Sequence, residues 1–104
     1  MAVTAKALAR TAAATSNATL YTVPTTSTTT VVTNIVVTNT ATSSATFTVN
    51  IDGVAVLSGT SLAANSSAFF DLKQVIPANA TPKTITGFAS ATTVNFHISG
   101  VELV

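Results

Sequence analysis

Apolar and polar residues alternate strictly from Ala45 to Asp52, so that every apolar side chain of this stretch lies on one face. Such alternation predicts a strand that buries one side. The pair Asp52-Gly53 follows, and it favours a type I′ turn because both central residues of that turn need a positive φ. A second strand is expected over residues 54–57, which completes a β-hairpin.

Other segments show the same strand signals, with proline or glycine between them. They cover residues 19–23, 29–39, 67–75 and 83–89. Short strands with turn signals about every 8 to 12 residues indicate an all-β fold. We therefore predict a single antiparallel β-sandwich, jelly-roll or immunoglobulin-like, of about seven or eight strands. Its predicted core contains Phe47, Val49, Ile51, Val94, Phe96 and Ile98.

The apolar phase changes near the C-terminus. Up to Ile98 the apolar residues occupy even positions, whereas Val101 and Leu103 occupy odd positions. One extra residue reverses the pleat of a strand, so the pattern predicts a β-bulge at Ser99-Gly100.

The segment 29–39 is apolar on both faces. The letters VVTN occur at 31–34 and again five residues later, and an odd offset turns the second copy to the opposite face. Val31, Ile35 and Val37 then line the core, while Val32 and Val36 share the outer face; the reversed phase, with Val32 and Val36 inward and Ile35 outward, is the alternative. Phe69 and Phe70 also point to opposite faces. An apolar outer face needs cover from the N-terminal segment or another subunit, unless surface valines are simply tolerated.

Residues 1–18 are interpreted as an N-terminal arm, outside a β-sandwich domain of residues 19–104. The segment shows neither clean strand alternation nor an amphipathic stripe, and no leucine-rich stretch follows its cations as in a signal peptide. Cations beside apolar residues suit a segment that becomes ordered along a neighbouring subunit, and a frayed tail is the alternative. The candidate interface comprises Val3, Lys6, Leu8, Arg10, Val32, Val36 and Phe69.

The amino-acid composition disfavours several classes of function. Only 7% of the 104 residues are charged, whereas about 25% is typical. A net charge of +1 disfavours nucleic-acid binding, which needs clustered cations. No stretch approaches the roughly 18 apolar residues of a membrane span, so we expect no membrane partner. The absence of cysteine excludes disulfides and thiolate metal sites.

Few residues could carry chemistry. His97 lies on the polar face of a predicted strand near Glu102, with no second histidine for a metal site. Asp71 and Lys73 share a strand face, where we expect weak pairing with each other or a neighbour rather than catalysis. No serine has a histidine and an acid at a recognisable spacing. We therefore expect no enzyme, no metal and no cofactor.

Several strings resemble small virion proteins of tailed bacteriophages. They are ATLYTVP at 18–24, the hairpin segment at 45–72 and the closing ISGVELV at 98–104. The resemblance covers residues 18–104 in order, with one departure: Thr25-Thr-Ser27 stands where a glycine-containing turn is expected after Pro24. It implies a compact antiparallel β domain that serves as a head decoration (cement) protein or a minor structural protein. It further implies the major capsid protein as partner, a homotrimer, and a place on the capsid surface of the virion after assembly in the host cytoplasm.

The leading hypothesis is a capsid decoration protein that binds the outer surface of a phage head and stabilises contacts between major capsid subunits. A small repeated part needs only modest contacts, because a symmetric shell multiplies them. The alternative is a tail, fibre or baseplate binding module that recognises host-surface glycan. The chain has no tryptophan and one tyrosine, which offers little aromatic surface for sugars. A third hypothesis is an enzyme accessory domain or an ice-binding domain.

Overall fold

The computed structural model describes residues 2–104, and within them the chain forms strands and no helix. The predicted all-β class is confirmed. The strands are β1 (Val3–Ala12), β2 (Ala18–Thr22), β3 (Thr29–Asn39), β4 (Ala45–Ile51), β5 (Val54–Leu62), β6 (Ser66–Ile76), β7 (Thr84–Ala89) and β8 (Val94–Leu103).

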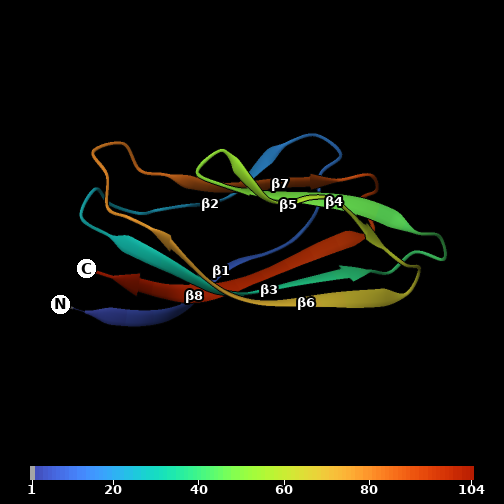
Figure 1. Ribbon diagram of the computed structural model, residues 1–104, viewed down its shortest axis with the longest axis horizontal. Helices are drawn as coiled ribbons and strands as arrows, with labels where there is room; N and C mark the ends of the chain where they lie inside the picture. The colour runs from blue at the N-terminus through green and yellow to red at the C-terminus, as the bar shows by residue number, and fades with distance from the viewer. Residues whose placement is uncertain (1) are drawn as a thin grey trace.

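The strands form two stacked antiparallel sheets (Figure 1). The first sheet has the order β1-β8-β3-β6 and the second sheet the order β2-β7-β4-β5. Eight strands that are distributed in this way make a jelly roll. The predicted β-sandwich is confirmed, and of the two topologies left open by the sequence the structure has the jelly roll.

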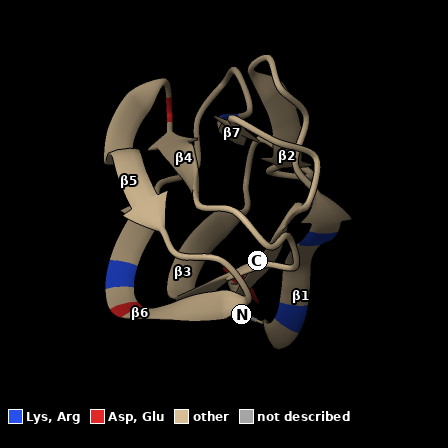
Figure 2. Ribbon diagram, turned by 90° about the vertical axis from the view of Figure 1, so that its right-hand side faces the viewer, with Lys and Arg blue, Asp and Glu red and all other residues tan. Residues whose placement is uncertain are grey.

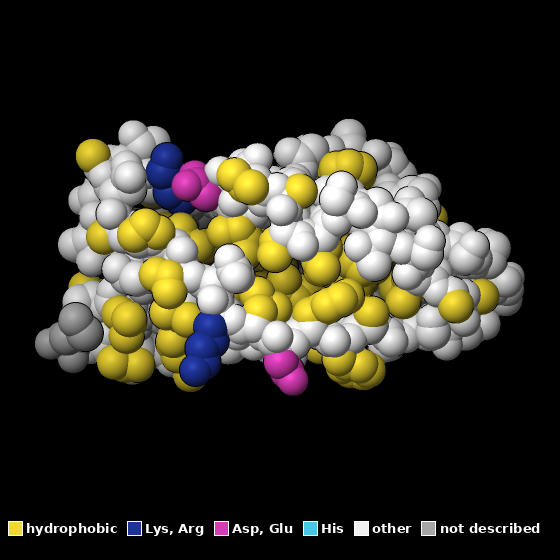
Figure 3. All heavy atoms as spheres, viewed as in Figure 1, with side chains coloured by type: hydrophobic (Ala, Val, Ile, Leu, Met, Phe, Trp, Pro, Cys, Tyr) yellow, Lys and Arg dark blue, Asp and Glu magenta, His cyan; other side chains and the backbone are white. Residues whose placement is uncertain are grey.

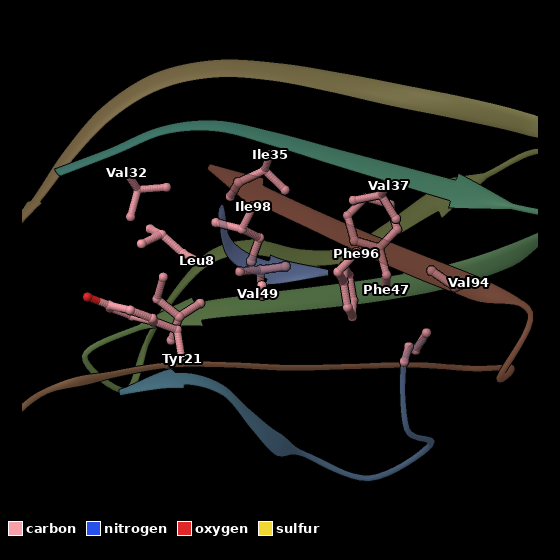
Figure 4. Close-up of a cluster of buried hydrophobic side chains, with 14 of the residues drawn as sticks. Leu8, Tyr21, Val32, Ile35, Val37, Phe47, Val49, Val94, Phe96 and Ile98 are labelled. Carbon is pink, nitrogen blue, oxygen red and sulfur yellow. The ribbon is translucent and has the colours of Figure 1, made fainter. Parts of the chain in front are cut away.

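The core lies between the two sheets. Of the six residues predicted for it, five are buried, and Ile51 packs partly buried at its border. Phe96 of the first sheet meets Phe47 of the second edge to face, with ring centroids 6.2 Å apart (Figure 4). Burial of such rings stabilises the fold by about 1.5–3 kcal/mol each.

The predicted hairpin joins β4 to β5. Asp52 and Gly53 have φ values of 54° and 74°, as the type I′ turn requires. The backbone N–H of Asp52 donates to the carbonyl of Thr84 at 2.9 Å, and its carboxylate lies 3.4 Å from the ammonium group of Lys83. These two contacts hold the turn against the start of β7. The second strand of the hairpin, β5, is longer than predicted.

The N-terminal segment differs from the expected arm. β1 is an edge strand of the first sheet and pairs with β8 from Val3 opposite Leu103 to Ala12 opposite Asn95. Leu8 is buried in the core of the same domain. The alternation was hidden for two reasons: alanine and threonine give little contrast between inner and outer faces, and a bulge at Leu8 shifts the register.

The phase predicted for β3 is wrong at Val31 and Val32. Val31 lies on the outer side, opposite Val101 and Val75, whereas Val32 is 0% exposed. The register shifts between Val32 and Asn34, where Thr33 is an extra residue relative to β8. Val32 therefore points inward together with Ile35 and Val37 (Figure 4). Val36 lies on the outer face, opposite His97. The reversed phase is wrong as well, because Ile35 is buried. The bulge offsets the odd spacing of the two VVTN copies, so that each copy buries its second valine.

The bulge predicted at Ser99-Gly100 is also wrong. β8 alternates without interruption, with residues 94, 96, 98, 100 and 102 all buried. The extra residues lie instead on its two neighbours, Leu8 on β1 and Thr33 on β3. Gly100 is needed there, because a Cβ at this position would collide with the carbonyl oxygen of Val31. As a result, Glu102 faces inward.

Candidate interaction surface

The outer side of the first sheet carries an apolar patch near the chain termini. Register places Val101 of β8 between Ala5 of β1 and Val31 of β3, and Val31 opposite Val75 of β6. Val3 and Val75, on the two edge strands, are 65% and 59% exposed. We call this patch the aliphatic face; it consists of Val3, Ala5, Val31, Val75, Val101 and Leu103.

A mixed row crosses the same side of the sheet next to the aliphatic face. Arg10 lies opposite His97, His97 opposite Val36, and Val36 opposite Phe69, with one residue from each strand. Phe69 is 73% exposed, and His97 is exposed as expected. Three of the residues predicted for an interface are thus brought together on one surface.

The predicted interface is therefore only partly assembled. Four of its seven residues lie on the outer side of the first sheet: Val3, Arg10, Val36 and Phe69. Leu8 and Val32 belong to the core. Lys6 is turned toward the interior, with its ammonium nitrogen 3.4 Å from both carboxylate oxygens of Glu102. Leu8 and Val32 were predicted to lie outside because the bulges on β1 and β3 are not apparent from the sequence.

A polar cluster joins the two sheets at one end of the core. Glu102, 8% exposed, accepts a hydrogen bond from the hydroxyl of Tyr21 at 2.5 Å. That hydroxyl also lies 2.8 Å from the side-chain oxygen of Thr30. Burial, together with the bond to Glu102, raises the pKa of Tyr21 to about 12. The cluster thus provides hydrogen-bond partners for the buried carboxylate of Glu102, one of them from the other sheet. The cluster was not predicted from the sequence, because the expected bulge placed Glu102 outside.

An apolar groove opens where β5 and β6 form the edges of the two sheets. Its volume is about 330 Å³. Figure 3 shows hydrophobic side chains gathered along this side of the molecule, between the two layers. The groove is lined by Ile35, Val56, Leu57, Phe69, Phe70, Asp71 and Leu72. Phe70 forms the floor of the groove and packs against Phe47, with ring centroids 6.2 Å apart.

The Lys and Arg residues of the first sheet and Asp71 lie on its two edge strands, β1 and β6 (Figure 2), whereas Glu102 lies on the inner strand β8. Asp71 of β6 accepts a hydrogen bond from the side-chain amide of Asn34 at 3.3 Å, and Lys73 is exposed on the same side of the strand. Residues 2–104 contain no cluster of three potential metal ligands. In the same residues, no helix has the length and apolar character needed to cross a membrane.

No protein-family model and no curated protein matches the sequence. Among solved structures, the chain is similar to a chain of the T13 particle of infectious bursal disease virus, with a TM-score of 0.56 and 15% identity over 97% of this chain and 30% of that one. A structure of the Gx strain of the same virus gives a TM-score of 0.54 and 18% identity, over 97% of this chain and 32% of the other. The chain thus spans less than a third of the length of these neighbours. What it shares with them is the fold, a jelly roll that also occurs within chains of a viral particle.

Proposed function

We propose that this chain is a viral structural protein, and more specifically a decoration (cement) protein that binds the outer surface of a tailed-phage head and stabilises contacts between major capsid subunits. The aliphatic face carries the proposal. A β-sandwich folds with one apolar side per sheet, so apolar residues on the outer side of the first sheet are not needed for folding. A contiguous exposed patch of this kind is typical of an interaction site.

Two further observations support a role in a virion. The jelly roll is similar to part of the chains of a viral particle, and the sequence resembles small phage virion proteins from residue 18 to the C-terminus. The low content of charged residues, 7%, suits a part that is held by apolar contact with the capsid protein and with other copies. In this proposal the role is structural rather than enzymatic, the protein assembles in the host cytoplasm, and the copies form homotrimers on the capsid.

Binding to bare heads of the phage that encodes the chain tests this function. Purified protein should sediment with the heads to a saturating ratio, and cryo-electron microscopy should show added density over the whole shell. Density confined to the tail or one vertex would contradict a decoration protein. That outcome would favour the alternative of a tail module that recognises host-surface glycan.

Paired variants test the surface itself. The double change Val31→Thr and Val101→Thr replaces two methyl groups of the aliphatic face by hydroxyls at nearly constant volume. We expect it to weaken head binding by about tenfold, because polar atoms then enter the contact. Thr22→Ala with Thr84→Ala, a directly opposed pair on the second sheet, is the control and should bind as the unmodified protein does. Equal binding by both double variants would exclude the aliphatic face as the docking surface.

A further inference from the structure

Arg10 is a cation with no acidic partner in the part of the chain that the structure describes. Of the two cations of β1, Lys6 is turned inward to Glu102, whereas Arg10 lies on the outer side of the first sheet and belongs to neither ion pair of residues 2–104. Figure 2 shows two separate basic bands on β1, but a base next to an acid, Lys73 and Asp71, on β6. The charge on the outer side of β1 is therefore unbalanced.

His97 lies directly beside Arg10. Register pairs it with Arg10 of β1 on one side and with Val36 of β3 on the other. The other neighbours of His97 on this face, along β8 and diagonally across it, are uncharged: they are Asn95, Ser99, Ala7, Ala12, Asn34 and Thr38. Protonation of His97 thus places a second positive charge next to Arg10, without an acid beside them among the residues described.

The acids of the first sheet do not neutralise this pair. Asp71 lies on β6, which β3 separates from β8, so it is about 10 Å away across the sheet at roughly 4.8 Å per strand. It also accepts a hydrogen bond from the side-chain amide of Asn34. Glu102 is on the same strand as His97, but it faces the interior and pairs with Lys6. A carboxylate from another molecule can therefore bind at Arg10 and His97 without competition from these acids.

The cationic pair is close to the aliphatic face. One row of small residues separates the two, with Ala7 opposite Ser99. Along β8, His97 and Val101 are about 13 Å apart, at roughly 3.3 Å per residue. A partner protein that covers the aliphatic face therefore reaches the cationic pair as well. Charge complementarity then requires a carboxylate on the partner at that distance from its own apolar patch.

We infer that the outer side of the first sheet docks on a protein surface that bears a carboxylate beside an apolar patch, and that His97 takes up a proton when the two surfaces meet. This docking mode rests on the proposed function, to which it adds the chemistry of the capsid surface and a dependence on pH. Histidine changes its charge between pH 5 and 8. The partner carboxylate favours the protonated ring, so by linkage a lower pH favours docking. At about pH 8 Arg10 alone holds the carboxylate.

Binding to bare heads at about pH 8 and about pH 6 tests this docking mode. The dissociation constant of the unmodified protein should fall about three- to tenfold at the lower pH. His97→Gln keeps a polar side chain that does not titrate, so it should bind equally at both pH values. Calorimetry in two buffers of different ionisation enthalpy should show that the unmodified protein takes up protons on binding and that His97→Gln does not.

Arg10→Gln tests the permanent charge of the pair, and it should weaken binding several-fold at about pH 8. Lys73→Gln is the matched control, because it removes an exposed cation from the opposite edge strand and should bind as the unmodified protein does. Circular dichroism of each variant reports whether the strands are retained.

The outcomes separate this docking mode from the proposed function. Head binding that does not change with pH, or that changes equally in His97→Gln, would overturn the role of His97 and leave the decoration function intact. Equal losses in Arg10→Gln and Lys73→Gln would show that overall charge, not the pair, attracts the partner, and would overturn the docking mode as well. No binding at either pH would contradict the decoration function itself, and the docking mode with it.

Discussion

The two sheets have similar inner faces and different outer faces. The inner faces supply one continuous apolar core. The outer side of the first sheet carries the aliphatic face, whereas the outer side of the second sheet presents a row of Thr19, Thr86 and Asn50 next to a single aromatic residue, Phe88. Asn50 donates a hydrogen bond from its side-chain amide to the hydroxyl of Thr86 at 3.3 Å. These polar groups therefore form hydrogen bonds with one another while they remain open to water. The second sheet shows what a jelly roll of this composition needs for folding. In the proposed function, the aliphatic face of the first sheet serves docking rather than folding.

The largest expected effect separates the inside of the first sheet from its outside. Phe96 is 0% exposed, and Phe96→Ala should cost about 3–5 kcal/mol of the free energy of unfolding, because it leaves a cavity beside Phe47. Phe69→Ala removes a ring that is 73% exposed, and it should change that free energy by less than about 0.5 kcal/mol. Urea denaturation of dilute protein measures both. Similar losses in the two variants would show that the outer side is needed for folding.

A smaller effect should distinguish the two sheets at matched glycines. A Cβ at Gly100 in β8 would collide with the Val31 carbonyl and lie 2.9 Å from a methyl group of Leu8. A Cβ at Gly87 in β7 would lie 2.8 Å from the Thr48 carbonyl oxygen and 3.1 Å from a methyl group of Leu20. Gly100→Ala should cost about 3 kcal/mol and Gly87→Ala about 1 kcal/mol, as judged by their thermal and urea midpoints. The reverse order would mean that the bulged first sheet yields more easily than the second.

The smallest effect concerns the hydrogen bond between the sheets. The neutral phenol of Tyr21 is favoured in the folded protein, because its pKa is raised from 10.0 to about 12. The resulting stabilisation, up to about 2 kcal/mol, is fully present below pH 10 and is lost as the pH rises through 12. Ultraviolet titration follows this group directly, since the chain has one tyrosine.

Tyr21→Phe is the control for that titration. It should be less stable at neutral pH, and it should lose the part of the alkaline destabilisation that comes from the phenol. If the absorbance of Tyr21 titrates near pH 10 in the folded protein, the phenol does not connect the sheets as described.

Several elements were predictable because a strand shows its own alternation. The segment 29–39 coincides with β3, and the alternation at 45–51 with β4. Asp52-Gly53 sets the turn through the positive φ values that both residues adopt. β1 was not predictable, because its alanines contrast too little with its threonines and its alternation breaks at Leu8. The outer side of the first sheet was found only in part, through Val3, Arg10, Val36 and Phe69.

What the sequence by itself determined is the all-β class, the hairpin and the residues that share a face within a regular strand, since these depend on local periodicity and turn chemistry. What only the tertiary structure decided is the phase wherever one strand has an extra residue relative to its paired neighbour. A bulge is a property of two paired strands, and the bulges at Leu8 and Thr33 lie on the neighbours of β8, not in β8 itself. β8 therefore keeps its alternation, Val101 and Leu103 turn outward, and Glu102 is buried against Tyr21.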